Sequence, residues 1–307
     1  MKHFLDVDQL SSNNVLKLIE RALFFKLSSR QDVPNYPTYP GVVLLHVFYE
    51  NSTRTQLSFD LAAKHLGLTV LNLDPKRSSE SKGEAMQDMC QTFAAMGVRL
   101  MVIRHPEDGA LQALSRVVPK SLQLVNAGDG MHAHPTQAML DIMTIMEHQL
   151  KPQDIKIALV GNIRHSRVAQ SLQRLCRVLD VGKLTLVGPE AWLPKNIIYG
   201  EATSSLQEGL NNADVVMTLR VQHERFSADD KDACDLATYR ENYAITSSTL
   251  RYAKQNALVM HPGPMNRGVE IDSDVADGAQ SCILQQVQNG VFMRMAILEW
   301  LIQSASF

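Results

Sequence analysis

The sequence predicts an α/β protein of two domains, each a parallel sheet flanked by helices. Three observations support this prediction. The chain has 307 residues, which is about two domains by length. Short apolar runs rich in Val, Leu and Ile alternate with segments of helical period, as in proteins built on parallel sheets. Polar clusters follow most of these runs, and ligands bind at that edge of a parallel sheet.

Composition excludes several classes of protein. Lys and Arg number 30 and Asp and Glu number 32, so the net charge is −2, and 45% of residues are hydrophobic. A disordered chain would have less apolar material, and a general nucleic-acid binder would usually show a basic excess. We therefore expect a globular protein with no nucleic-acid partner.

The cysteines and the apolar runs indicate a cytoplasmic setting. Four cysteines lie far apart at 90, 176, 234 and 282 and form no CxxC pair. Asp6 and Asp8 stand where a signal peptide needs its apolar stretch. The longest run free of charged residues, 33–49, contains three prolines, so we expect no membrane span.

In the first half of the chain, apolar runs predict four strands separated by helices. The segment 34–40 is a proline-rich rigid connection, and Ser12 or Asn13 is the expected N-cap of the first helix. The predicted strands are 42–48, 68–73, 98–103 and 122–125, and the predicted helices are 11–29, 54–66, 84–96 and 109–118.

The second half repeats this alternation, which predicts a second sheet. Its predicted strands are 155–160, 183–187, 214–218 and 257–260, and its predicted helices are 166–180, 203–212 and 281–303. The segment 134–150 joins the two sets of strands.

The first polar cluster is Ser52-Thr53-Arg54-Thr55, between a predicted strand and a predicted helix. Backbone N–H groups at a helix N-terminus favour an anion, and the Arg fork suits a phosphate. A plain helix cap with a surface Arg is an equal alternative from these four residues alone. Neither nucleotide-binding glycine fingerprint is present.

Two further clusters in the first half also follow strands. Arg104 ends one strand, either as a second cation for the same anion or as a surface residue. His134 and Gln137 are three apart, so on a first helical turn they point to one side and could hold a carbonyl and an amide. A zinc pair of His132 and His134 is the weaker alternative, because no Cys or acidic partner stands at ligand spacing.

The remaining clusters lie in one loop of the first half and after three strands of the second. The polar loop 78–84 on its own suggests only a solvated connection. The clusters 161–167 and 219–225 each follow a strand, and their strand-end arginines suggest a receptor for a dicarboxylate, with a phosphate or nucleotide pocket as the alternative. The segment 261–268 is rich in Pro and Gly and forms either a stiff loop that exposes carbonyls or a plain turn.

Taken in order, these clusters resemble the aspartate/ornithine carbamoyltransferase family along nearly the whole chain. The matching motifs are FYENSTRT at 48–55, SKGE at 81–84, RHP at 104–106, NAGDGMHAHPTQ at 126–137, HSRV at 165–168, LRVQHER at 219–225 and HPGPMNRG at 261–268. The chain is most similar to the aspartate branch, because the ornithine branch carries His-Cys-Leu-Pro where this chain has His261-Pro262-Gly263-Pro264.

The resemblance implies transfer of a carbamoyl group from carbamoyl phosphate to L-aspartate, an early step of pyrimidine synthesis. It implies that the phosphate is bound by Ser52, Thr53, Arg54, Thr55 and Arg104, with Ser78 and Lys82 contributed by an adjacent subunit. Thr55, Arg104 and His134 would polarise the carbamoyl oxygen, and Gln137 with the backbone at Gly263 and Pro264 would hold the carbamoyl nitrogen. Arg167, Arg220, Gln222 and Lys82 would bind the aspartate carboxylates.

The resemblance also implies domains, partners and the absence of a cofactor. The carbamoyl-phosphate domain would be 1–133, with a C-terminal helix at about 285–307 packed back on it. A linking helix at 134–150 would lead to an aspartate domain at 151–284, with the active site in the cleft between the domains. The family works as a homotrimer with shared sites, and neither a metal nor an organic cofactor is implied.

Other readings stay open at this stage. The chain could carbamoylate another amino acid, or it could be a non-catalytic scaffold, and regulatory chains or a dihydroorotase could surround the trimer. We expect Glu50 to contact Arg167 or Arg225 when the domains close on substrate. Gln56 stands where many relatives have Arg and Asn162 where many have Asp, which affects local salt bridges only.

Overall fold

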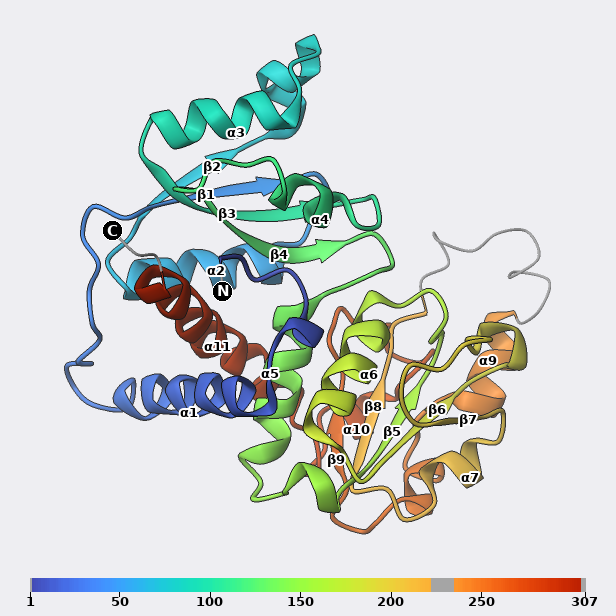
Figure 1. The fold of residues 1–307 in the computed structure, drawn as a ribbon. Helices are drawn as coiled ribbons and strands as arrows, with labels where there is room; N and C mark the ends of the chain where they lie inside the picture. The colour runs from blue at the N-terminus through green and yellow to red at the C-terminus, as the bar shows by residue number, and fades with distance from the viewer. Residues whose placement is uncertain (1, 222–234, 305–307) are drawn as a thin grey trace. The chain divides into compact units, whose positions relative to one another are not determined.

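The computed structural model describes residues 2–221 and 235–304, which form two compact units (Figure 1). Unit 1 comprises residues 1–140 and 288–307, and unit 2 comprises residues 141–287. Both borders fall inside helices, one in α5 (Pro135–Met146) and one in α11 (Ile283–Ser304). The substrate that the resemblance assigns to each domain stays a prediction.

Unit 1 is built on a parallel sheet of four strands in the order β2-β1-β3-β4. Leu45 in the middle of β1 lies beside Leu71 of β2 on one side and Met101 of β3 on the other. The elements are α1 (Ser12–Ser28), β1 (Val43–Phe48), α2 (Thr53–His65), β2 (Thr69–Leu73), α3 (Met86–Ala95), β3 (Val98–His105), α4 (Ala110–Ser115) and β4 (Gln123–Asp129).

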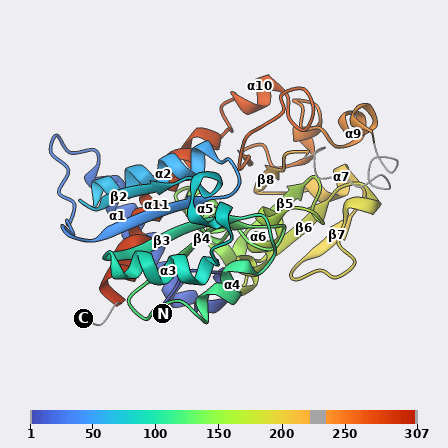
Figure 2. The same ribbon diagram turned by 90° about the horizontal axis from the view of Figure 1, so that it is seen from above.

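Helices cover both faces of this sheet, because alternate residues of its strands are apolar on each side. α3 and α4 pack on one face against a cluster that includes Val47 and Ile103. α2 covers the other face (Figure 2), and on that face Phe59 contacts the ring of His46.

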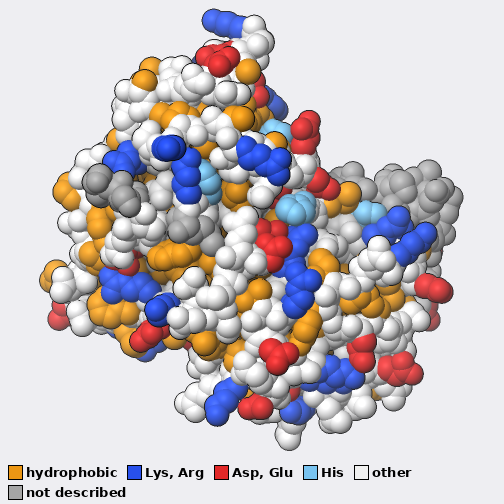
Figure 3. Space-filling view, viewed as in Figure 1, with side chains coloured by type: hydrophobic (Ala, Val, Ile, Leu, Met, Phe, Trp, Pro, Cys, Tyr) orange, Lys and Arg blue, Asp and Glu red, His pale blue; other side chains and the backbone are white. Residues whose placement is uncertain are grey.

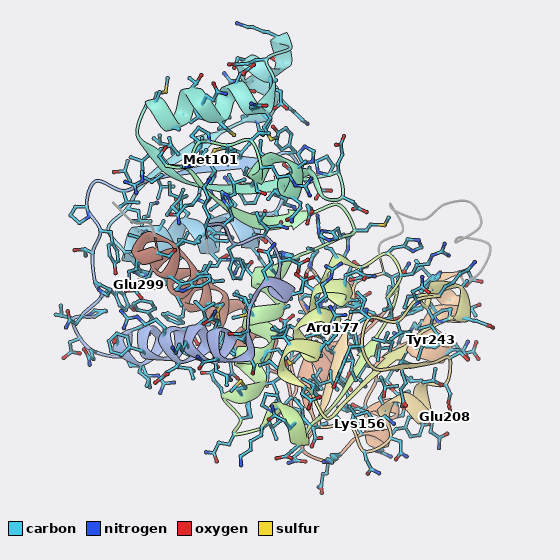
Figure 4. All side chains as sticks on the ribbon, viewed as in Figure 1. Met101, Lys156, Arg177, Glu208, Tyr243 and Glu299 are labelled. Atoms are coloured by element: carbon cyan, nitrogen blue, oxygen red, sulfur yellow. The ribbon has the colours of Figure 1, made fainter. Side chains whose placement is uncertain are left out.

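Most of α11, from residue 288 onward, belongs to unit 1 although it follows unit 2 in the chain. Glu299 on α11 (Figure 4) accepts two hydrogen bonds from Arg21 of α1, at 2.6 and 2.8 Å. The Lys26 amine donates to Asn289 at 2.8 Å, and the Gln123 amide donates to the carbonyl of Leu301 at 2.9 Å. These buried polar groups are paired, as burial requires.

Unit 2 is built on a second parallel sheet, of five strands in the order β7-β6-β5-β8-β9. The two sheets confirm the predicted α/β class. The elements are β5 (Lys156–Val160), α6 (Arg167–Leu179), β6 (Lys183–Val187), β7 (Glu201–Thr203), α7 (Leu206–Leu210), β8 (Val215–Thr218), α9 (Leu236–Tyr243), β9 (Leu258–Met260) and α10 (Ser273–Ala276).

An aromatic stack fills part of the core of unit 2. Trp192 stacks on Tyr239 of α9 with ring centroids 5.2 Å apart, and Tyr239 stacks on Tyr243 at 5.5 Å. Tyr243 reaches across from α9 to donate a hydrogen bond to the carbonyl of Ser204 (Figure 4). The stack belongs to a hydrophobic cluster that includes Val160 of the central strand β5. This cluster packs one face of the sheet whose carboxyl edge carries the candidate site residues of unit 2.

The structure corrects three details of the expected elements. Ser11, and neither Ser12 nor Asn13, is the N-cap of α1, because Ser11 is extended and its hydroxyl accepts from the N–H of Asn14 at 3.2 Å. The helix expected at 203–212 is only α7, and its first expected residue lies in β7. Ser205 caps α7, so the helix cannot begin earlier. The helices α9 and α10 were not expected.

No helix among the described residues is long and apolar enough to cross a membrane. On the face shown in Figure 3, acidic and basic side chains are interspersed, in keeping with the net charge of −2.

Candidate active site

The predicted site residues of unit 1 lie at one edge of its sheet. β1, β3 and β4 are adjacent and parallel, so their carboxyl ends share an edge. Ser52–Thr55 follow β1, and His134 and Gln137 follow β4. Arg104 lies near the end of β3, directly beside Phe48 of β1 in the register. The structure therefore brings these predicted residues to the edge where ligands bind in such folds.

The start of α2 has the properties of an anion site. Ser52 is the N-cap residue, yet its side chain makes no capping hydrogen bond. Thr53, Arg54 and Thr55 form the first turn, whose N–H groups have no partner within a helix and point toward its N-terminal end. Thr55 is buried and Arg54 is exposed, so the turn combines a buried hydroxyl with an exposed cation.

Arg104 contacts the carboxylate of Glu50, which lies in the connection between β1 and α2. Its Nε lies 3.2 Å from Oε2 of Glu50, and its Nη1 donates to the carbonyl of Ala127 at 3.4 Å. Sequence reasoning expected Glu50 to contact Arg167 or Arg225 in the substrate-bound state. That contact stays a prediction, and Arg225 lies outside the described residues.

A hydrogen-bonded loop after β4 leads to His134. Asn126 donates to Asp129 at 2.8 Å and accepts from the N–H of Gly128 at 2.7 Å. Burial alone would raise the pKa of Asp129, but hydrogen bonds from His132, Asn126 and the N–H of Gly109 hold that pKa below its usual value. The ionised carboxylate thus fixes the loop.

His134 and Gln137 lie at the start of α5 and are both buried. The N–H of Gln137 donates to the carbonyl of His134 at 3.0 Å, which places the two residues on one turn. His132, the other half of the alternative zinc pair, contacts Asp129 at 3.1 Å. Among the residues that the structure describes, no group of three or more His, Cys, Asp or Glu side chains is placed to hold a metal ion.

The loop 75–84 carries two further predicted residues. It contains the short 3-10 helices η2 (Pro75–Arg77) and η3 (Ser79–Lys82). Ser78 is buried and donates to the carbonyl of Pro75 at 2.7 Å, whereas Lys82 ends η3 and is exposed. In Figure 1 this loop extends beyond the end of α3.

The same loop contacts the segment before α2 through Tyr49 and Glu80, a contact that the sequence did not predict. The hydroxyl of Tyr49 donates to Glu80 at 2.6 Å, and the ring of Tyr49 packs on His105 with centroids 4.8 Å apart. Burial and the Glu80 carboxylate raise the pKa of Tyr49. A cavity of about 700 Å³ lies here, lined by residues from the end of β1, the start of α2, β2 and the loop, among them Asn51, Gln56, Asn72 and Ser81.

The predicted residues of unit 2 lie at the corresponding edge of the second sheet. β5, β8 and β9 are adjacent and parallel, and Arg167, Arg220 and Gly263 follow them in turn. Arg167 is the first residue of α6 and is buried, with its helix capped by the hydroxyl of Ser166. Two strand-end guanidinium groups on neighbouring strands suit a ligand with two carboxylates. Gln222, the remaining predicted aspartate ligand, lies outside the described residues.

The Gly263–Pro264 turn rests on a buried polar group that sequence reasoning also missed. Gly263 has a φ of +67°, a conformation that favours glycine. Below the turn, Nε2 of His261 lies 3.1 Å from Oε1 of Glu270, and both side chains are fully buried. The sequence alone gave no signal for this pair, because a separation of nine residues fits neither a helical nor a strand period.

Comparison with known proteins places the chain in a family. Residues 2–147 match the family described as "Aspartate/ornithine carbamoyltransferase, carbamoyl-P binding domain", and residues 153–301 match "Aspartate/ornithine carbamoyltransferase, Asp/Orn binding domain". The chain is 54% identical to the aspartate carbamoyltransferase catalytic subunit of Legionella pneumophila over 304 residues, which is 99% of this chain and 100% of the relative.

Solved structures give the same result. The aspartate transcarbamoylase of Trypanosoma cruzi in complex with carbamoyl phosphate and aspartate superimposes with a TM-score of 0.87 and 30% identity, over 97% of this chain and 95% of that one. The ornithine carbamoyltransferase of Pyrococcus furiosus has a TM-score of 0.88 over 99% of this chain and 98% of that one, but at 22% identity it shows the fold alone. With both of its halves matched and its full length aligned, the chain belongs to the aspartate/ornithine carbamoyltransferase family.

Proposed function

We propose that the chain transfers the carbamoyl group of carbamoyl phosphate to the amine of L-aspartate, giving N-carbamoyl-L-aspartate and phosphate in de novo pyrimidine biosynthesis. The observation that carries the proposal is the 54% identity to an aspartate carbamoyltransferase catalytic subunit along the whole chain. The two sheet edges support it, because one presents an anion-binding helix start and the other presents two guanidinium groups. A cytoplasmic location is part of this proposal.

Carbamoyl phosphate would bind at the edge of unit 1. Its phosphate would accept hydrogen bonds from the first turn of α2 and from the side chains of Ser52, Thr53, Arg54 and Thr55. Arg104 would contribute a second cation, and its contact with Glu50 at 3.2 Å keeps the guanidinium in place beforehand. Gln137 and the backbone carbonyls at Gly263 and Pro264 would hold the carbamoyl nitrogen.

The chemistry needs positioning and charge stabilisation more than a side-chain nucleophile. The aspartate amine attacks the carbonyl carbon, and the bond from that carbon to the phosphate oxygen breaks with its electron pair leaving on phosphate. Negative charge develops on the carbonyl oxygen, where Thr55, Arg104 and His134 would donate hydrogen bonds. The departing phosphate would take the proton that the amine loses.

Aspartate would bind at the edge of unit 2. Arg167 and Arg220 would each hold a carboxylate, with Gln222 and Lys82 completing the subsite. An acceptor with a cationic side chain, such as ornithine, would meet like charge at these guanidinium groups. This repulsion favours aspartate over the alternative acceptors.

The proposal includes a homotrimer whose neighbouring subunits contribute Ser78 and Lys82 to each site. Lys82 is exposed at the end of η3 and is thus accessible to another subunit, whereas Ser78 is buried and its hydroxyl would have to leave the carbonyl of Pro75 to contribute. β2 is an edge strand, and Leu57 and Leu61 on α2 are 55% and 48% exposed. Edge strands and exposed apolar side chains are typical of surfaces that another chain covers.

The first experiment is an assay of the purified chain with carbamoyl phosphate and either L-aspartate or L-ornithine. We expect carbamoyl-aspartate and no citrulline. Product from ornithine alone would overturn the assignment of Arg167 and Arg220. The absence of both products in the trimeric protein would favour the scaffold alternative.

A complementation assay tests the shared site. Lys82→Ala and Arg54→Ala chains should each lose nearly all activity as pure trimers, because each removes one half of every site. Every mixed trimer would contain one intact site, because a chain that keeps Arg54 adjoins a chain that keeps Lys82 at one of its three interfaces, so activity should return in part. Mixed trimers as inactive as the parents would show that the sites are not shared.

A further inference from the structure

The segment that follows β9 folds around a buried His–Glu pair. His261 is 1% exposed and Glu270 is 0% exposed. The ring Nδ1 of His261 accepts a hydrogen bond from the N–H of Gly263 at 2.8 Å, and Nε2 lies 3.1 Å from Oε1 of Glu270. The same oxygen accepts from the N–H of Asn266 at 2.5 Å. One carboxylate therefore fixes both sides of the Gly263–Pro264 turn.

These contacts assign the protonation of His261. An N–H group can donate only to a ring nitrogen that carries a lone pair, so Nδ1 is unprotonated and the ring proton resides on Nε2. Nε2 then donates to Glu270. If the proton moved to Nδ1, the N–H of Gly263 would face another donor and lose its partner in a buried place, which is costly.

The remaining contacts anchor the pair to Gln286 on α11 and Asp141 on α5, in the parts of these helices that belong to unit 2. The backbone N–H of His261 donates to Oε1 of Gln286 at 2.8 Å, and the amide of Gln286 donates to Oδ1 of Asp141 at 2.8 Å. Oε2 of Glu270 has no hydrogen-bond partner among the described residues. Burying this carboxylate is thus costly, and its two hydrogen bonds both go to the segment 261–266.

A buried pair can serve stability alone, but the placement here favours a role in the turn. A purely structural pair would be expected to join separate elements. The hydrogen bonds of Glu270 instead go to residues four and nine positions earlier, on either side of Gly263 and Pro264. Its effect is therefore to set the orientation of the peptide groups between them.

We propose that Glu270 is a positioning residue for the carbamoyl-nitrogen subsite: through His261 and Asn266 it orients the carbonyls at Gly263 and Pro264. The inference rests on the proposed function, which assigns the carbamoyl nitrogen to these carbonyls. The inference adds Glu270, a residue that does not itself contact substrate. It predicts that changes at Glu270 weaken the binding of carbamoyl phosphate but leave the binding of phosphate nearly unchanged.

The test compares Glu270→Met, which fills the space without an acceptor, with Glu270→Gln, which keeps an acceptor oxygen. Carbamoyl-aspartate formation is measured for both, with inhibition by inorganic phosphate alongside. We expect Glu270→Met to raise KM for carbamoyl phosphate about tenfold and leave phosphate inhibition within about twofold, because phosphate binds in unit 1. Glu270→Gln should restore most of the affinity. The matched control is Glu299→Gln, which alters a buried carboxylate of unit 1 and should lower Tm without changing KM.

A second pair of variants keeps the proposal testable if Glu270→Met does not fold. The amide oxygen of His261→Asn can replace Nδ1 as acceptor for Gly263, whereas the amide of His261→Gln can replace only Nε2. We expect KM for carbamoyl phosphate to rise at least fivefold in both variants, because the Asn variant loses the link to Glu270 and the Gln variant loses the acceptor for Gly263. A KM equal to that of the wild type in all folded variants would overturn the positioning role. An inactive wild-type chain would overturn the proposed function instead.

Discussion

His46, a buried histidine on β1, makes stability sensitive to acid. His46 lies on β1 between Phe48 and Phe59, with ring centroids 5.8 and 6.4 Å away. Burial lowers the pKa of His46 from 6.5 to about 4. The folded state thus resists a proton that the unfolded chain accepts below about pH 6.5, so stability falls as the pH drops from 6.5 toward 4.

We expect His46→Leu to remove this part of the acid sensitivity. Through His46, the wild type should lose about 3 kcal/mol of unfolding free energy between pH 7 and pH 4, since one pKa unit corresponds to about 1.4 kcal/mol. The variant should not show this loss. Urea unfolding at several pH values measures it. His3, whose pKa burial also lowers to about 4, provides a remaining acid-sensitive group, so the variant should keep some pH dependence. Parallel curves for variant and wild type would contradict the assignment to His46.

Glu50 gives a second prediction at the level of one residue. In the structure it pairs with Arg104, and the sequence predicts a contact with an arginine of the aspartate domain once substrates bind. Glu50→Ala should therefore raise KM for aspartate about tenfold, as measured by initial rates. Glu107→Ala removes an exposed carboxylate three positions from Arg104 and should leave that KM unchanged. An unchanged aspartate affinity in Glu50→Ala would count against the contact.

At the level of elements, two adjacent serines at the start of α1 have different roles. Ser11 accepts a hydrogen bond from Asn14, whereas Ser12 is already helical. Ser11→Ala should lower the free energy of unfolding by about 1 kcal/mol, because a lost cap leaves a helix N–H without its partner. Ser12→Ala should change it by a few tenths at most, since Ala favours helices. Thermal or chemical unfolding of the two variants distinguishes them, and equal losses would contradict the observed cap.

The strands were predictable because buried parallel strands are continuous apolar runs. β1, β5 and β6 each lie within one residue of the expected bounds. β7 was missed because its three residues, Glu201–Thr203, are mostly exposed at the sheet edge and have no apolar run. α9 begins after the N-cap Asp235, a signal that could have been used.

Predicting the site depended on a different kind of information. The rule that ligands bind beyond strand ends selected Ser52–Thr55, Arg104 and the cluster 161–167 as candidates, because each follows a run that is visible in the sequence. Their roles came only from the resemblance. The partners Tyr49–Glu80 and His261–Glu270 were not predicted, since their contacts depend on how loops fold over 31 and nine residues of chain.

At the level of the whole molecule, unit 1 needs both ends of the described chain. The α11 side chains buried in unit 1 include Met293, Ile297, Leu298 and Leu301, all 0% exposed. At roughly 2 kcal/mol each, their burial contributes about as much as the net stability of a typical domain. A chain ended after Val287 should therefore lose cooperative unfolding of unit 1 while unit 2 keeps its own transition.

Calorimetry and hydrogen exchange on this shortened chain provide the measurement. We expect the amides of β1, β3 and β4 to exchange as in an unfolded segment, and those of β5 and β8 to stay protected. Native-like protection of β1 without residues 288–304 would show that α11 is dispensable for unit 1.

The position of α11 also has a consequence for synthesis on the ribosome. Residues 141–287 form unit 2 without interruption, whereas unit 1 lacks a helix until residues 288–304 have been translated. At about 5 to 20 residues per second, the first 140 residues would wait roughly 8 to 33 s for that helix. Unit 1 is thus the first unit to be synthesised and the last to be completed. During that interval, nascent chains would expose to chaperones the apolar surface that α11 later covers.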